Sequence, residues 1–215
     1  MLKLYSYWRS SASYRVRIAL ALKAVDYQYL PVHLMRDGGE QNQPAYRALN
    51  PQGRVPYLID GDFGLGQSLA ILDYLEARFP QPALIPAEPR ERARMWAFCH
   101  AICADIQPLQ NTGVLNYLSQ ELHVSDEQKK TWLRFWIERG LIALEQERVA
   151  ASDGDYVFGD KPTLADCLLV PQIYAAERFG CDQRHYPQLQ AIAEKLRVRP
   201  AFVAAHPDSQ PDAQR

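Results

Sequence analysis

Several features that mark particular classes of protein are missing from this 215-residue sequence. Its 24 basic and 25 acidic residues leave a net charge of −1, which gives no electrostatic attraction to nucleic acid or to an anionic membrane. Charged residues or prolines interrupt each apolar run before it could span a bilayer. The N-terminus lacks the basic, then apolar, then small-residue order of a secretion signal. We therefore expect a cytoplasmic globular protein that binds neither nucleic acid nor a membrane.

Cysteine pairs at close spacing are also missing. The four cysteines form no C-x-x-C pair, so the sequence shows neither a dithiol redox motif nor a metal site. Cys99 and Cys103 are four residues apart in a segment whose apolar residues recur at helical spacing: Met95, Phe98, Ile102 and Ile106. We predict that both thiols lie in a helical core, and that the cysteines are reduced.

The first 80 residues mix strand and helix patterns. The predicted order is a strand after Lys3, a helix ending near Lys23, a strand over 26–34, a short helix near 46–49, a hairpin around Asp60-Gly61 and a helix opened by Gln67 and Ser68. This β-α-β-α-β-β-α order is typical of a thioredoxin-like domain. Residues 1–80 are therefore predicted to form an α/β domain.

The pattern changes after Phe79. Residues 81–89 lie in the proline-rich stretch "PQPALIPAEP" and are predicted to be a linker. Helical patterns dominate from Arg90 onward, and capping-box spacings begin at Ser125 and Thr163. We predict that residues 90–215 form an all-helical domain that ends in a disordered polar tail, "HPDSQPDAQR".

Two adjacent serines stand between the first predicted strand and the first predicted helix. Ser10 or Ser11 is a natural N-cap, because a serine hydroxyl can accept a hydrogen bond from a free N–H group of the first turn. The same helix N-terminus is also suited to bind a negative charge. In a thioredoxin-like domain this loop lies at the active edge, so both interpretations are open.

Five motifs together resemble one known family. In order along the chain they are "SYWRSSASYRVRIALALK", "ALNPQGRVPYLIDG", "GQSLAILDYLE", "DIQPLQN" and "TLADCLLVPQ". They resemble the zeta-class glutathione transferases, which include maleylacetoacetate isomerases, from Leu4 to about Pro211. The resemblance implies the glutathione transferase architecture, glutathione as cofactor and a homodimer.

The resemblance also implies roles for individual residues. Ser10 is the expected main hydrogen-bond donor to the glutathione thiolate, and Ser11 is the second candidate for this catalytic role. Val55 precedes a proline that is expected to be cis. The residues expected to bind the cofactor are Ser10, Ser11, Arg15, Gln41, Val55, Gln67, Ser68, Asp105, Gln107 and Asn111, and those expected to bind the substrate are Arg9 and Arg178.

Two of these assignments have open alternatives. The family usually has cysteine at the position of Ala12, but the attacking thiol would come from glutathione, so activity is expected to survive the difference. Asp105 either reaches the cofactor ammonium across a dimer interface or is a plain surface carboxylate.

The implied activity is the glutathione-dependent cis–trans isomerisation of maleylacetoacetate to fumarylacetoacetate, in the breakdown of tyrosine and phenylalanine. Alternatives are the isomerisation of maleylpyruvate, a general glutathione transferase activity, and a non-catalytic interaction module with the same fold. A disulfide oxidoreductase is not expected, since the loop at the active edge has no cysteine.

Overall fold

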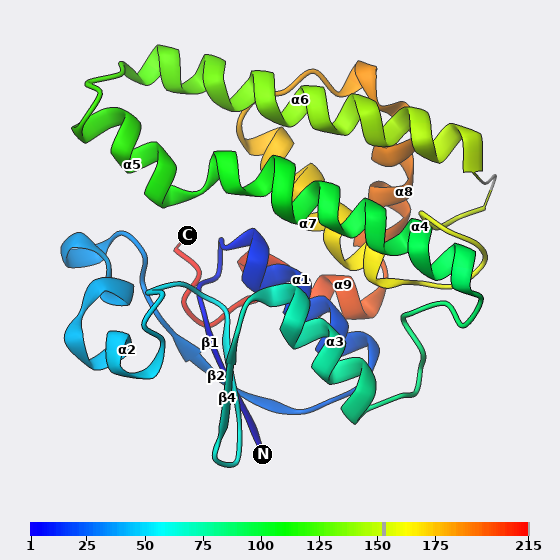
Figure 1. The fold of residues 1–215 in the computed structure, drawn as a ribbon, viewed down its shortest axis with the longest axis horizontal. Coiled ribbons are helices and arrows are strands. Elements are labelled where there is room, and N and C mark those ends of the chain that lie inside the picture. Colours follow the sequence, from blue (N-terminus) through cyan, green and yellow to red (C-terminus); the bar gives the residue numbers. More distant parts are fainter. Residues whose placement is uncertain (152–153, 215) are drawn as a thin grey trace. The chain divides into compact units, whose positions relative to one another are not determined.

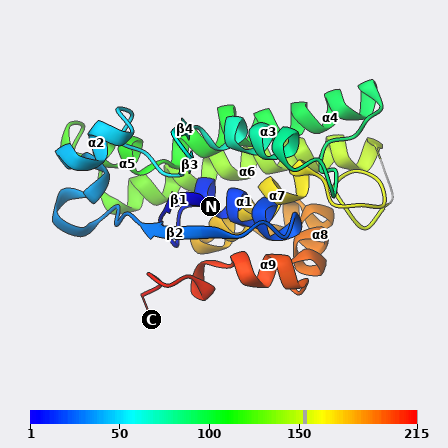
Figure 2. The ribbon, with the colours of Figure 1, turned by 90° about the horizontal axis from the view of Figure 1, so that it is seen from below.

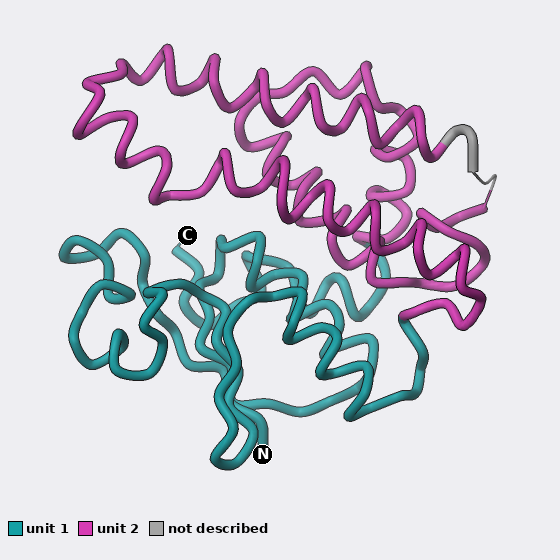
Figure 3. The backbone as a smooth tube through the Cα atoms, in the orientation of Figure 1, with its two compact units in different colours: residues 1–84, 198–215 teal, residues 85–197 magenta. Residues whose placement is uncertain are grey.

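The computed structural model describes residues 1–151 and 154–214. The chain forms two compact units (Figure 3). Unit 1 consists of Met1–Leu84 together with Val198–Arg215, and unit 2 consists of Ile85–Arg197.

A mixed four-stranded sheet is the centre of unit 1. Its strands, in spatial order, are β2 (Tyr27–Pro31), β1 (Leu2–Ser6), β3 (Tyr57–Asp60) and β4 (Phe63–Gly66). Strand β1 is parallel to β2 and antiparallel to β3, and β3 and β4 form the predicted antiparallel hairpin. Gly61 takes a φ of 62° in its two-residue turn, a conformation that costs glycine little.

Four α-helices complete unit 1: α1 (Ser11–Leu22), α2 (Pro44–Leu49), α3 (Ser68–Arg78) and α9 (Pro200–Ala205). Its described residues also form 3-10 turns at Arg36–Gly38 and Glu40–Asn42, between β2 and α2, and at Pro207–Ser209, after α9. Helix α1 packs against both α3 and α9 (Figure 1). The core of unit 1 includes the fully buried side chains of Leu4, Val16, Leu20, Leu58, Leu72 and Leu75. Leu69, which the pattern of its helix also directs inward, is half-buried because it lies in the first turn of α3. The predicted element order and the thioredoxin-like fold of the N-terminal domain are confirmed.

The described part of unit 2 contains helices joined by turns and loops. Its α-helices are α4 (Pro89–His100), α5 (Thr112–Gln120), α6 (Asp126–Ala151), α7 (Leu164–Arg178) and α8 (Pro187–Arg197), shown from a second side in Figure 2. A π-helical turn (Ala101–Ile106) and a 3-10 turn (Gln107–Gln110) connect α4 to α5, and a further 3-10 turn (Gln183–His185) precedes α8. No helix among the described residues is both long and apolar enough to cross a membrane.

The predicted helical core and helix caps of unit 2 are present. The four apolar residues from Met95 to Ile106 are buried with Cys99, whereas Cys103 is only partly buried, and all four cysteines are free thiols. Ser125 and Gln128 exchange the two hydrogen bonds of a capping box, and so do Thr163 and Asp166. Each pair satisfies N–H groups that the first turn of a helix leaves free.

The C-terminal segment differs from its prediction. The sequence predicts a disordered tail over residues 206–215 and places residues 198–205 in the helical domain, but Val198–Arg215 belong to unit 1, with α9 packed on α1. Composition alone misled here, because the polar residues of this segment hydrogen-bond to groups far away in the sequence, as Asp212 does to the amide of Trp8.

Candidate active site

The N-terminus of helix α1 carries the two predicted serines. Ser10 is the N-cap, and its Oγ accepts a hydrogen bond from the N–H of Ser13 at 3.2 Å. Because a hydroxyl has one donor proton besides its acceptor lone pairs, Ser10 can still donate. The N–H groups of Ser11 and Ala12 have no partner within the described chain. One hydroxyl donor and two backbone donors therefore meet at the positive end of the helix dipole.

The N-terminus of helix α3 is tied to α1 by a buried arginine. Arg15 is 1% exposed, and its Nη1 donates to the Oγ of Ser68 at 3.2 Å. This bond leaves the Ser68 hydroxyl proton free to donate to an acidic group. Gln67, just before the helix, has a φ of 65° and donates from its side-chain amide to Gln52 at 2.7 Å. A positive φ at a residue other than glycine or asparagine is uncommon and clusters at ligand sites.

Val55 contributes backbone groups. The Val55–Pro56 peptide bond is cis, as predicted. The side chain of Val55 packs in a buried cluster with Tyr7, Trp8, Val32 and Tyr46, so it lies beside the loop that leads to the serines. Its N–H and C=O have no hydrogen-bond partner in the part of the chain that the structure describes. Buried backbone groups are seldom left unpaired, and such a pair suits an extended peptide ligand.

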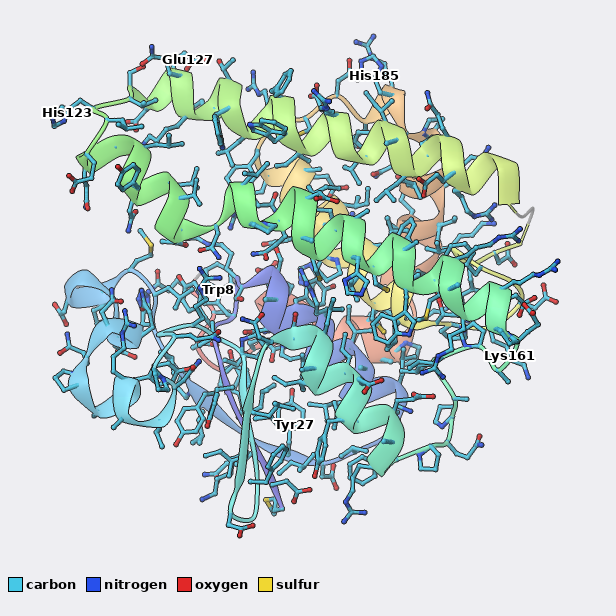
Figure 4. The ribbon with its side chains drawn as sticks, in the orientation of Figure 1. Trp8, Tyr27, His123, Glu127, Lys161 and His185 are labelled. Atoms are coloured by element: carbon cyan, nitrogen blue, oxygen red, sulfur yellow. The ribbon has the colours of Figure 1, made fainter. Side chains whose placement is uncertain are left out.

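Two further predicted residues of unit 1 flank these groups. Gln41 is half-buried: its Nε2 makes a long bond of 3.4 Å to the carbonyl of Leu34, and its Oε1 has no partner within the described residues. The guanidinium of Arg9 lies 5.3 Å from the ring centroid of Trp8, a cation–π contact. Figure 4 shows Trp8 at the N-terminal end of α1.

Comparisons with known proteins identify the family. A family profile described as "Glutathione S-transferase, N-terminal domain" matches residues 4–83. A maleylacetoacetate isomerase of Pseudomonas aeruginosa is 53% identical over 212 residues, which is 98% of each chain. A holo structure of maleylpyruvate isomerase, a bacterial zeta-class glutathione transferase, has a TM-score of 0.96 at 42% identity, over 99% of this chain and 100% of that one. The chain belongs to the zeta-class glutathione transferase family.

Glutathione is the cofactor that goes with zeta-class membership. The structure of a maleylacetoacetate isomerase from Anaeromyxobacter dehalogenans, with glutathione bound in its active site, matches with a TM-score of 0.88 at 44% identity, over 100% of this chain and 98% of that one. The groups found here fit such a ligand. Donors at two helix N-termini suit a thiolate and a carboxylate, and the unpaired backbone of Val55 suits peptide groups.

The remaining predicted residues lie in unit 2 of the zeta-class chain. Gln107 is half-buried at the start of the 3-10 turn, and Asp105 is exposed within the preceding π-helical turn. Asn111 is the N-cap of α5, where its Oδ1 accepts from the N–H of Gly113 at 3.1 Å. Arg178 is exposed at the C-terminal end of α7, with its guanidinium 4.4 Å from the ring centroid of Phe179. Their roles towards ligands stay predictions.

Tyr46 belongs to the same buried cluster as Val55 and Trp8. Burial raises the pKa of the Tyr46 hydroxyl well above its usual value, and this hydroxyl donates to the carbonyl of Arg54 at 2.7 Å. Tyr46 is therefore neutral in the working range of an enzyme and serves packing. No group of three or more histidine, cysteine, aspartate or glutamate residues could hold a metal ion in the described parts of the chain.

Two residues next to the predicted serines or bonded to that loop were not predicted from the sequence. Trp8 is buried with its indole Nε1 unpartnered among the described residues, and Asp212 bonds to the Trp8 amide. The position of Trp8 beside the serines was an available signal. Nothing local in the sequence pointed to Asp212, because it lies 204 residues away from Trp8.

Proposed function

We propose that this enzyme is a glutathione-dependent isomerase that converts maleylacetoacetate to fumarylacetoacetate in tyrosine and phenylalanine breakdown. The observation that carries the proposal is the N-terminus of α1, where the Ser10 hydroxyl and the unpaired N–H groups of Ser11 and Ala12 converge. When bound, glutathione supplies a thiol whose ionised form is a nucleophile.

The chain's own part in the reaction is to stabilise a thiolate and hold its carrier. A free thiol is only a few per cent ionised at pH 7, so donors at the sulfur are needed to favour the anion. Ser10 is the proposed main donor, and Ser11 is the second candidate. All of these donors belong to serines or to the backbone, so the alanine at position 12 removes none of them.

The proposed cofactor-binding residues of unit 1 hold the two ends and the middle of the tripeptide. Ser68 and the free N–H groups at the start of α3 receive the γ-glutamyl carboxylate, with Arg15 orienting Ser68 from inside the unit. The Val55 backbone pairs with the peptide groups of the cofactor, and Gln41 binds its glycyl end. Gln67, the cofactor-binding residue at the N-cap of α3, has the positive φ from which the helix begins.

The proposed substrate-binding residues are arginines. Maleylacetoacetate carries two carboxylates, and guanidinium groups recognise carboxylates with paired hydrogen bonds. Arg9 precedes the serines, and Arg178 ends α7. Gln107 and Asn111 of unit 2 are proposed cofactor-binding residues.

The substrate is tested by comparing two maleyl acids. Maleylpyruvate isomerisation is the rival activity, favoured by the structural match to an enzyme of that name. We expect a higher kcat/KM for maleylacetoacetate than for maleylpyruvate, measured at saturating glutathione by following each trans product. The reverse order would assign the enzyme to maleylpyruvate, and conjugation without isomerisation would indicate a general transferase.

A homodimer is also proposed, and with it a role for Asp105 at the cofactor ammonium of the neighbouring subunit. The exposed carboxylate of Asp105 is available for such a contact. Sedimentation equilibrium should give a mass of about twice 24.6 kDa at micromolar concentration. A monomer would remove both proposals. A cytoplasmic location is supported by the four free thiols, because oxidising compartments favour disulfides.

A further inference from the structure

The short loop between β1 and α1, residues 7–10, is held by buried polar contacts from two directions. Its own turn is closed by the Ser10 N–H, which donates to the Tyr7 carbonyl at 3.0 Å. Arg17 of α1 adds two bonds, from Nη1 to the Tyr7 carbonyl at 3.3 Å and from Nη2 to the Trp8 carbonyl at 2.9 Å. From the other direction, Oδ2 of Asp212 accepts from the Trp8 N–H at 3.1 Å.

Asp212 is itself fixed on the sheet. Its Oδ1 accepts from the hydroxyl of Tyr29, on strand β2, at 2.6 Å. The next residue, Ala213, packs against the buried cluster that contains Trp8 and Val55. Figure 1 shows the C-terminal segment, drawn in red, ending beside the loop that leads into α1. One carboxylate therefore joins the loop before the serines to the edge strand of the sheet.

Arg17 links the same loop to the end of α9 in the C-terminal segment. It is 1% exposed, and its Nε donates to the carbonyl of Ala205, the last residue of α9, at 3.1 Å. Burial lowers the pKa of Arg17, and the negative charge of Asp212 is among the groups that act in the opposite direction. The arginine and the aspartate thus hold the loop and the C-terminal segment together as one polar network.

We propose that Asp212 is a positioning residue of the isomerase site: by holding the Trp8 amide, the C-terminal segment fixes the loop that presents Ser10 to the glutathione sulfur. The inference rests on the proposed function. Trp8 lies two residues before Ser10, so releasing its amide frees one side of the loop. A donor stabilises a thiolate only within a narrow range of distance and angle, so a looser loop stabilises it less.

The aspartate variants separate positioning from charge. Asp212→Ala removes both acceptors. Asp212→Asn keeps one oxygen for the Trp8 N–H and offers its amide to the Tyr29 hydroxyl oxygen, so the two contacts can be retained without the negative charge. Asp208→Ala is the matched control, since Asp208 is an exposed carboxylate of the same segment.

Two measurements are made on each full-length variant. Hydrogen–deuterium exchange of the peptide that spans Trp8 is followed without ligand, and the thiol of bound glutathione is titrated by thiolate absorbance. For Asp212→Ala we expect exchange at the Trp8 amide to speed up about tenfold and the pKa of the bound thiol to rise by about 0.5–1. Asp212→Asn and Asp208→Ala should stay close to wild type in both measurements.

The outcomes decide between positioning and plain stabilisation. If Asp212→Ala lowers the melting temperature but leaves the thiol titration unchanged, or if Asp212→Asn shifts the titration as far as alanine does, the proposal is overturned. If Asp212→Ala does not fold, Tyr29→Phe provides the test, because it releases Oδ1 of Asp212, together with a hydrogen bond to Ser6, and leaves Oδ2 to hold the Trp8 amide. It should shift the thiol pKa in the same direction by less, and an unchanged titration overturns the proposal. Failure of the wild type to bind millimolar glutathione would instead refute the proposed function, and the exchange measurement would still report whether Asp212 holds the loop.

Discussion

Replacing Ser10 by alanine affects two separate contacts of one hydroxyl group. The first is the N-cap of α1, where Oγ accepts from the Ser13 N–H at 3.2 Å. Losing a serine cap costs about 1 kcal/mol of stability, which lowers the melting temperature of a chain of this length by about 2–4 °C. The second is the proposed donation to the glutathione sulfur.

The proposed donation to the sulfur determines how the substitution affects the thiol pKa and the isomerisation rate. A hydrogen bond to a charged acceptor is worth about 1.5–3 kcal/mol, which corresponds to a change in pKa of about one to two. Ser10→Ala should therefore raise the pKa of the bound thiol by that amount, towards its value in solution. At neutral pH the isomerisation rate should fall by up to about 10–100-fold, and raising the pH should recover part of it.

The assay is thiolate absorbance of bound glutathione, titrated against pH in the wild type and in Ser10→Ala, Ser10→Asp and Ser11→Ala. Ser10→Asp keeps a capping oxygen but replaces the donor with a negative charge, so it should preserve stability while raising the thiol pKa at least as far as alanine does. Ala12→Cys should change the rate only modestly. If Ser10→Ala leaves the titration unmoved while Ser11→Ala shifts it, the donor is Ser11; if neither serine matters, their hydroxyls only cap the helix.

Three further predictions concern binding and stability. Ser68→Ala should raise the KM for glutathione and change kcat little, because this hydroxyl binds the cofactor equally in the ground and transition states; a large fall in kcat alone would contradict the assignment. Lys23→Ala should lower the free energy of unfolding, measured in urea, by about 3 kcal/mol. It removes a buried ammonium that lies 2.7 Å from the Glu76 carboxylate and donates to two backbone carbonyls. A loss below about 1 kcal/mol would contradict the buried ion pair. Burial raises the pKa of Asp166 from 3.8 to about 6, so the folded chain binds this proton more tightly than the unfolded chain does. The resulting stabilisation is fully present only below the unfolded pKa of 3.8 and is lost as the pH rises through 6. Relative to Asp166→Asn, the wild type should gain about 2 kcal/mol between pH 7 and pH 4, and a pH-independent difference would refute the prediction.

Much of the candidate site could be predicted, because short sequence patterns around its residues mark the helix N-termini that form it. The N-cap of α1 follows from two serines placed before an apolar helical pattern, and Ser10 fills it. The N-terminus of α3 follows in the same way from Gln67 and Ser68. By contrast, the cis bond at Val55 came only from the family resemblance, since few X–Pro bonds are cis.

Other features could not be predicted because they depend on partners far away in the chain. Arginine is usually exposed, yet Arg15 and Arg17 are both buried in the middle of α1. Arg15 is buried because Ser68 accepts its hydrogen bond, and Arg17 because the carbonyls of Tyr7, Trp8 and Ala205 surround it. No helical periodicity distinguishes such arginines from solvated ones.

The sequence by itself determined the order of strands and helices, the hairpin at Gly61 and both capping boxes of unit 2. Each of these depends on residues within about four positions of one another, and such short-range patterns set backbone hydrogen bonding and the buried face directly. Only the tertiary structure decided where the polar C-terminal segment lies. Its composition resembles that of a disordered tail, but Asp212 accepts hydrogen bonds from the amide of Trp8 and the hydroxyl of Tyr29. These partly buried bonds join groups 204 and 183 residues apart, so they exist only once the sheet and α1 have formed.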